Sequence, residues 1–172
     1  MTSRLAREAA EAASGARRQL ADCQGRITEL ARRLHARPPA LVVTCARGSS
    51  DHAATYGKYL IETTVGQLVA SVGPSVASLY GRPLIGFEGA LFIVVSQSGR
   101  SPDLIELTSA ARAGGALVVG MLNDEAAPLA AHCDVVIPLC GGEERSVAAT
   151  KSFLLSGLAF LQLAAAWSDD PA

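Results

Sequence analysis

The stretch that decides the fold is Ala90-Leu91-Phe92-Ile93-Val94-Val95-Ser96-Gln97-Ser98-Gly99-Arg100-Ser101-Pro102-Asp103. Its first six residues are apolar, which is typical of a strand covered on both faces of a parallel sheet. A polar turn with one glycine follows. Ser101 then suits the N-cap of a helix and Pro102 its first position, because proline has no N–H to leave unpaired. Strand, polar turn and helix in this order indicate one βα unit.

The same alternation extends through the rest of the chain. We expect strands at residues 41–45, 67–72, 90–95, 116–120 and 134–138. We expect helices at residues 51–65, 74–80, 102–113, 128–131 and 148–167. Buried strands between helices predict a three-layer α/β/α domain over residues 40–168, with a five-stranded parallel sheet and right-handed crossovers.

Residues 1–37 form a separate N-terminal helical segment in this interpretation. Apolar residues from Leu5 to Leu34 recur at spacings of three and four, which predicts one helix over residues 4–36. Gly15 and Gly25 are its candidate interruptions. The segment holds eight arginines and four acids, whereas the remainder holds seven bases and twelve acids. We interpret the arginines as a solvated helix face, because the net charge of −1 argues against a nucleic-acid partner.

Composition excludes several other classes of protein. With 172 residues, of which 49% are hydrophobic and 18% charged, the chain has the content of one folded domain. The apolar run at residues 153–167 is shorter than the ~20 residues that span a bilayer, so we expect no membrane partner.

Cysteine spacing and missing motifs bear on the compartment and on cofactors. The four cysteines contain no C-x-x-C pair, and no secretory signal opens the chain, so we expect a cytoplasmic protein. No dinucleotide-binding or P-loop glycine motif is present. We expect neither a metal nor an organic cofactor.

Two strand-to-helix loops carry unusual numbers of hydroxyl groups. Ligands of parallel sheets bind beyond the carboxyl ends of the strands. After the expected strand 41–45, Gly48 permits a tight turn, and Ser49 and Ser50 offer hydroxyls and amides to an anion. A capped turn without a ligand would explain that loop equally well. The loop after residue 95 supplies more groups than one cap needs, which fits a phosphate cradle: Ser96, Gln97, Ser98 and Ser101.

The loop from Cys140 to Lys151 leaves two interpretations open. It is long and contains glycine, so it could fold over a ligand, and Glu144 would then face the site. Its charged residues could equally form a solvated cluster. Lys151 lies near the expected helix start, where it is a candidate for contacting an acidic group or a loop carbonyl. His52 could face a ligand, with a surface or capping role as the alternative.

Three motifs together resemble the SIS family of sugar-isomerase phosphosugar-binding domains, over about residues 40 to 167. They are Gly48-Ser49-Ser50, Ser96-Gln97-Ser98-Gly99 and Ser146-Val147-Ala148-Ala149-Thr150-Lys151. The resemblance implies a strand order of 2-1-3-4-5, which places the two serine loops side by side. It implies that the phosphate is held by Ser96, Gln97, Ser98 and Ser101, with Ser49 helping. It further implies that the sugar pocket is lined by Arg47, Gly48, Ser50 and Val147.

Within the family, the chain looks like the first lobe of two-lobed amino-sugar-phosphate enzymes, either the isomerase portion of glucosamine-6-phosphate synthase or the SIS-type glucosamine-6-phosphate deaminases. Two positions depart from the synthase pattern: Arg47 stands where the synthase has cysteine, and Ser101 where it has threonine. The segment Arg47-Gly48-Ser49-Ser50-Asp51-His52 looks closer to the deaminase-type members. No cysteine follows Met1 to act as a glutaminase nucleophile.

The resemblance therefore implies a phosphosugar-binding lobe of an isomerase or deaminase. The acid/base carboxylate and the ring-opening histidine would come from a second lobe or a neighbouring subunit, so the catalytic residues stay unassigned. We expect a first-lobe fragment whose partners are a sugar phosphate and a second SIS lobe or a second copy in a homodimer. An aminotransferase-type isomerase lobe and a non-catalytic sugar-phosphate sensor remain the alternatives.

Overall fold

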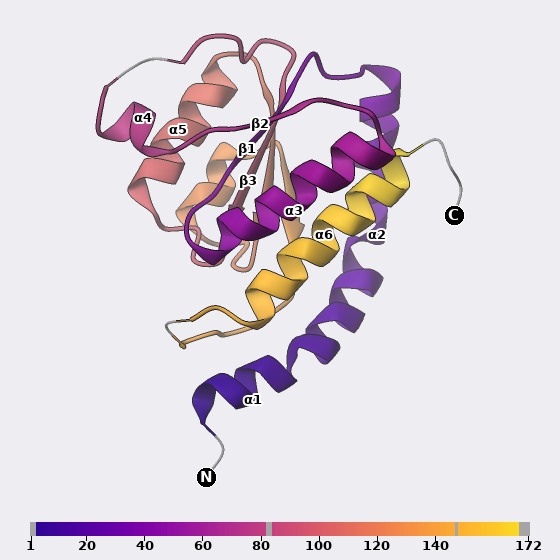
Figure 1. The fold of residues 1–172 in the computed structure, drawn as a ribbon, viewed down its shortest axis with the longest axis vertical. Helices are drawn as coiled ribbons and strands as arrows, with labels where there is room; N and C mark the ends of the chain where they lie inside the picture. The colour runs from indigo at the N-terminus through magenta and orange to yellow at the C-terminus, as the bar shows by residue number, and fades with distance from the viewer. Residues whose placement is uncertain (1–2, 82–83, 147, 169–172) are drawn as a thin grey trace.

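The computed structural model describes residues 3–81, 84–146 and 148–168. Its elements in chain order are α1 (Arg4–Ala10), α2 (Ala12–Ala36), β1 (Val42–Cys45), α3 (Ser49–Thr64), β2 (Val69–Ser71), α4 (Ser75–Ser78), β3 (Leu91–Ser96), α5 (Pro102–Ala113), β4 (Leu117–Leu122), the 3₁₀ helix η1 (Pro128–His132), β5 (Val135–Pro138) and α6 (Lys151–Trp167) (Figure 1).

The five strands form one parallel sheet in the order β2-β1-β3-β4-β5. This order confirms the one that the family resemblance implied. Each expected strand is present, and its boundaries agree within one residue except at the start of β2, two residues later than expected, and at the end of β4. β4 continues to Leu122, two residues past its expected end, and keeps pairing with β3 through Ser96.

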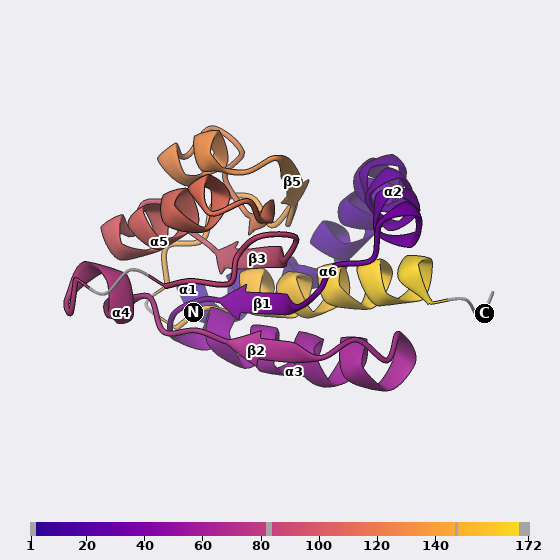
Figure 2. The ribbon, with the colours of Figure 1, turned by 90° about the horizontal axis from the view of Figure 1, so that it is seen from above.

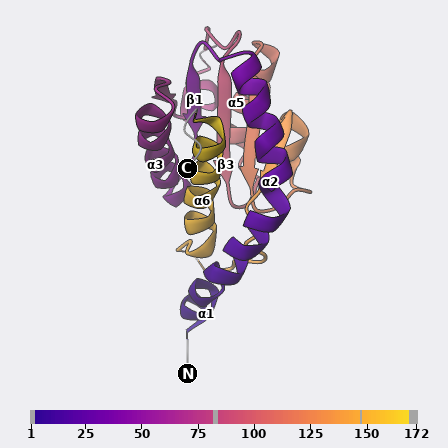
Figure 3. The same cartoon turned by 90° about the vertical axis from the view of Figure 1, so that its right-hand side faces the viewer.

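The sheet lies between two helical layers, which confirms the α/β/α prediction. α2, α3 and α6 cover one face, and α5 with η1 covers the other, as Figures 2 and 3 show from two directions. The central strand β3 serves both cores, because side chains of a strand alternate between faces. Ile93 and Val95 point into the first core and Phe92 and Val94 into the second, all fully buried.

The N-terminal segment is helical, as predicted, but it divides into two helices at a position other than the two expected interruptions. The break falls at Glu11, which ends α1 and precedes α2. Both glycines that were candidate interruptions lie inside α2, and Gly15 packs against Leu155 of α6. α2 shares the main core with the sheet through residues on one of its faces, Cys23, Ile27, Leu30, Ala31 and Leu34.

The last helix begins at Lys151, three residues later than expected. Residues 148–150 were predicted as its first turn, but a carboxylate from the preceding loop caps the helix at residues 150–152, as described below. In the described part of the chain, no helix combines the length and the apolar content needed to cross a membrane.

Candidate functional site

The carboxyl ends of β1 and β3 lie side by side, because these strands pair through Cys45 and Val94. β2 lies beyond β1 and β4 beyond β3, so the strand order reverses at this point, where parallel sheets bind ligands. The loops 46–48 and 97–101 therefore adjoin. An ion pair joins the first loop to the helix that follows the second: Arg47 Nη1 is 3.0 Å from Oδ2 of Asp103, whose side chain is largely buried in the first turn of α5.

The loop after β3 needs glycine at position 99. Gly99 has a φ of 60°, and a Cβ there would lie 2.5 Å from the Cβ of Ala127. The buried Ser96 shapes the turn, because its Oγ accepts the N–H of Gly99 at 3.0 Å. Ser98 is exposed and its Oγ accepts the N–H of Arg100 at 3.3 Å, which leaves the hydroxyl proton of Ser98 free to donate.

Two helices begin at this edge of the sheet. Ser101 is the N-cap of α5 and Gly48, with a φ of 58°, is the N-cap of α3. In the structure as described, the hydroxyls of Ser49, Ser50 and Ser101 make no hydrogen bond. Hydroxyl donors beside helix N-termini suit a bound anion.

His52 lies on the exposed surface of the first turn of α3, and no hydrogen bond of its ring is found among the described residues. Nothing in the structure brings it together with the serines of the β3 loop. Val147, predicted to line the sugar pocket, lies outside the described residues.

The loop between β5 and α6 is tied to both neighbouring loops. Asn123, directly after β4, accepts the N–H of Gly141 at 2.9 Å and donates to the carbonyl of Gly142 at 2.7 Å. Gln97 donates its side-chain amide to the carbonyl of Glu144 at 3.3 Å. The β5–α6 loop therefore contacts the candidate phosphate loop directly.

The carboxylate of Glu144 caps α6. It accepts the N–H and hydroxyl of Thr150 at 2.8 and 2.9 Å, the N–H of Lys151 at 2.9 Å and the hydroxyl of Ser152. Burial alone would raise the pKa of Glu144, but the hydrogen bonds from Ser152 and Thr150 outweigh it, and the pKa lies below its usual value. The solvated-cluster alternative fits the exposed ion pair of Glu143 with Arg145 and does not fit Glu144.

Lys151 is fully buried, and its ammonium lies 2.5 Å from the carboxylate of Glu11, at the break between α1 and α2. It therefore contacts an acidic group, but one that belongs to the N-terminal helices.

A cavity of about 600 Å³ lies beside the loop after β3. Its lining comes from the loops that follow β3, β4 and β5, including Gln97, Ser98, Asn123 and Glu144.

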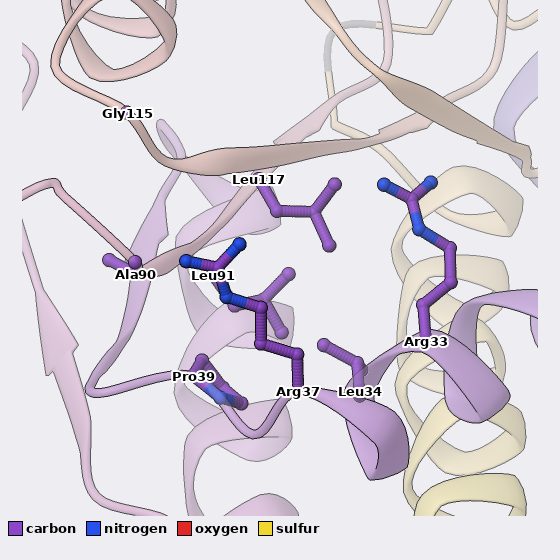
Figure 4. A pocket seen from close by; sticks show the side chains of 9 residues that line it. Arg33, Leu34, Arg37, Pro39, Ala90, Leu91, Gly115 and Leu117 are labelled. Carbon is purple, nitrogen blue, oxygen red and sulfur yellow. The ribbon is translucent and has the colours of Figure 1, made fainter.

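A second cavity, of about 180 Å³, lies at the amino ends of β3 and β4 (Figure 4). Arg33 and Arg37 project over it from the carboxyl end of α2, where the helix dipole favours cations.

The profile of the SIS domain family matches residues 40–166. The chain belongs to the SIS domain family. In sequence it is 36% identical, over 128 residues, to the glutamine–fructose-6-phosphate aminotransferase [isomerizing] of Symbiobacterium thermophilum; the match covers 73% of this chain and 20% of the relative.

Two solved structures are similar to this SIS domain. One is a Silicibacter pomeroyi protein assigned as a phosphosugar isomerase, with a TM-score of 0.89 and 44% identity over 95% of this chain and 50% of that one. The other is the C-terminal domain of glucosamine-fructose-6-phosphate aminotransferase from Francisella tularensis, with a TM-score of 0.78, 21% identity, and coverage of 91% and 45%. The chain thus spans about one fifth of its curated relative and about half of these structures.

Sequence reasoning missed three residues that shape this site of the SIS domain. Asn123 follows β4, and an asparagine at the carboxyl end of a buried strand was a usable signal, lost because the strand was expected to end at residue 120. Asp103 was visible as an acid in the first turn of α5, but its partner Arg47 could be found only from the strand order. Glu8, in α1, contacts the β5–α6 loop and gave no signal in the sequence.

Proposed function

We propose that this SIS domain binds a sugar phosphate, with the phosphate group in the loop after β3. The observation that carries the proposal is the strand order, which brings the hydroxyl-rich loops after β1 and β3 together at the switch point. The aminotransferase and isomerase names of the similar proteins support a phosphosugar as the ligand.

The proposed phosphate contacts come from both loops. Ser98 and Ser101 offer uncommitted hydroxyl protons, and Ser49 approaches from α3. Gln97 offers the second N–H of its side-chain amide, because the amide already donates to the carbonyl of Glu144. Ser96 acts chiefly by shaping the turn. Arg47, Gly48, Ser50 and Val147 are proposed to line the sugar pocket, with Arg47 aligned by Asp103.

We propose that the whole protein isomerises or deaminates an amino-sugar phosphate. The bound phosphate would anchor the open-chain sugar, and a carboxylate would then move a proton between C1 and C2 through an enediol or enamine intermediate. The carboxylate would come from a second lobe, because this chain corresponds to about half of the Silicibacter protein. This proposed chemistry uses no metal or organic cofactor.

We further propose that a second SIS lobe or a second copy covers the outer surface of α3 and α6. Several large apolar side chains there are exposed, including Tyr59 at 64% and Leu154 at 55%. Exposed large apolar side chains on two neighbouring helices support an interaction site there. A strict monomer by light scattering at high concentration would contradict this part.

The four free cysteines favour a reducing, cytoplasmic location.

Titration calorimetry tests the binding proposal, with glucosamine 6-phosphate, fructose 6-phosphate and glucosamine as ligands. We expect phosphate-dependent binding, with Ser98→Ala weakening it about tenfold or more, as for loss of a hydrogen bond to a charged group. Ser109→Ala, an exposed serine in the second half of α5, is the matched control and should bind as the wild type does. Binding that survives Ser98→Ala unchanged, or that glucosamine shows equally, would refute the proposed cradle.

A further inference from the structure

α1 is attached to the rest of the protein by a carboxylate. Glu8 is the one buried residue of this helix, and the apolar Leu5 beside it is 41% exposed. The carboxylate of Glu8 accepts the N–H of Arg145 at 2.9 Å and the N–H of Ser146 at 3.1 Å. These residues lie in the β5–α6 loop, more than 130 positions away in sequence. Apolar burial, which usually docks a helix, is therefore not what holds α1 in place.

The hydrogen bonds from Ser146 and Arg145 lower the pKa of Glu8, so the group is a charged carboxylate at neutral pH. Two successive backbone N–H groups that point at one anion form a concave anion site. Glu8 fills this site from within the chain, and the conformation of residues 145 and 146 is fixed by it.

The N-terminal helices contact the β5–α6 loop at three successive points. Arg18 donates to the carbonyl of Cys140 at 2.8 Å, where the loop begins. Glu8 accepts a hydrogen bond from Arg145 in the middle of the loop. Glu11 forms an ion pair with Lys151, where the loop enters α6. Because the helix breaks at Glu11, the α1–α2 segment contacts both the middle and the end of the loop. Figure 1 shows α1 near the start of α6.

The residue next to the Glu8 contacts is Glu144, whose carbonyl accepts the hydrogen bond from Gln97 of the candidate phosphate loop. A continuous series of contacts thus runs from Glu8 through the β5–α6 loop to Gln97. We propose that Glu8 is a positioning residue for sugar-phosphate binding: it holds the β5–α6 loop against the loop after β3. This inference rests on the proposed function.

The test compares Glu8→Gln with Glu29→Gln in the full 172-residue chain. The Glu8→Gln side chain would keep one acceptor oxygen but present an NH₂ group to the second amide. Glu29 is a matched control, because it is also a helical carboxylate that accepts two hydrogen bonds, but its donor Arg32 is an exposed side chain of the same helix. We expect Glu8→Gln to weaken fructose 6-phosphate binding about tenfold, the size of one charge-assisted hydrogen bond. Hydrogen exchange at residues 145 and 146 should accelerate together with this loss.

Inorganic phosphate separates positioning from general damage to the site. Its proposed contacts lie in the loops after β3 and β1, and none lies in the β5–α6 loop, so its affinity should stay within about twofold in Glu8→Gln, and β3 should keep its exchange protection. The positioning role would be overturned if Glu8→Gln lost binding of both ligands. It would also be overturned if fructose 6-phosphate binding were unchanged while exchange in the β5–α6 loop became faster. Wild-type protein that binds no sugar phosphate would overturn the proposed function as well, which distinguishes the two failures.

Discussion

Replacing Glu144 by alanine is expected to lower the free energy of unfolding by about 2–3 kcal/mol. The first contribution is loss of the cap on α6, typically about 1 kcal/mol. The second is the loss of a partner for buried donors, about 1–2 kcal/mol in total, because the capping contribution already includes part of this cost. Lys151 and Ser152, which donate an N–H and a hydroxyl to Glu144, are only 1% and 2% exposed, so water cannot readily replace the carboxylate.

Urea denaturation followed by far-UV circular dichroism measures this change, with an unchanged m-value expected. The corresponding loss of Tm is about 4–12 °C, at roughly 2–4 °C per kcal/mol for a chain of this size. Glu143→Ala is the control, because Glu143 is 70% exposed and its partner Arg145 is 64% exposed. An exposed pair of this kind contributes about 0–1 kcal/mol. Equal effects of the two substitutions would refute the capping argument.

The capping contribution should also depend on pH with a definite sign. The pKa of Glu144 is lowered in the folded protein, so its stabilisation is present above the unfolded-state pKa of about 4.3 and is lost as the pH falls through the folded-state value. The difference in stability between wild type and Glu144→Ala should therefore be full at pH 7 and shrink below about pH 4. A difference that is equally large at pH 3 and pH 7 would show that the charge of the carboxylate does not matter.

Three further predictions concern the turn, the buried lysine and the chemistry. Gly99→Ala should lower the free energy of unfolding in urea by about 3 kcal/mol or more, and abolish phosphosugar binding by calorimetry, because the added Cβ meets Ala127. Gly142→Ala is the control, with an expected loss of about 1–2 kcal/mol, because Gly142 also has a positive φ but its Cβ would meet open space. Glu11→Ala should lower the free energy of unfolding more than Lys151→Met does in the same assay, because it leaves the buried ammonium of Lys151 without its partner. The reverse order would contradict the pairing. The chain by itself should not catalyse exchange of the C2 proton of glucosamine 6-phosphate with D₂O, followed by proton NMR.

Hydrophobic pattern and turn chemistry were enough to predict the layers and the strands. The buried runs are continuous and short, and helix α5 begins after Ser101 and spans the expected residues 102–113. The strand order needed the family resemblance, because periodicity places a strand in a sheet without saying which strand lies next to it. Once the order was known, the meeting of the two serine loops followed from it.

The parts that could not be predicted depend on contacts between residues far apart in sequence. Apolar spacing runs unbroken from Leu5 to Leu34, so the helix break at Glu11 has no local cause; Glu8 and Glu11 instead bind partners near residue 150. The start of α6 is set by Glu144, which caps the helix from six residues upstream, outside the spacing of the usual capping box. Single polar contacts of this kind leave no periodic trace in the sequence.

The carboxylates around the candidate site support the proposal that this domain binds the ligand and that another lobe supplies the acid/base group. A carboxylate that shuttles a proton must be able to approach the sugar carbons and change its protonation state. The cavity beside the β3 loop is lined by four carboxylates, Asp124, Glu125, Glu143 and Glu144. The first three are held by Arg100, Arg26 and Arg145, at N···O distances of 2.9, 2.6 and 2.5 Å, and the fourth is committed to α6. Each of these carboxylates is therefore already engaged by a partner within this chain. These contacts support the proposal that the acid/base group comes from a second lobe and that this domain contributes hydroxyls for binding the phosphate.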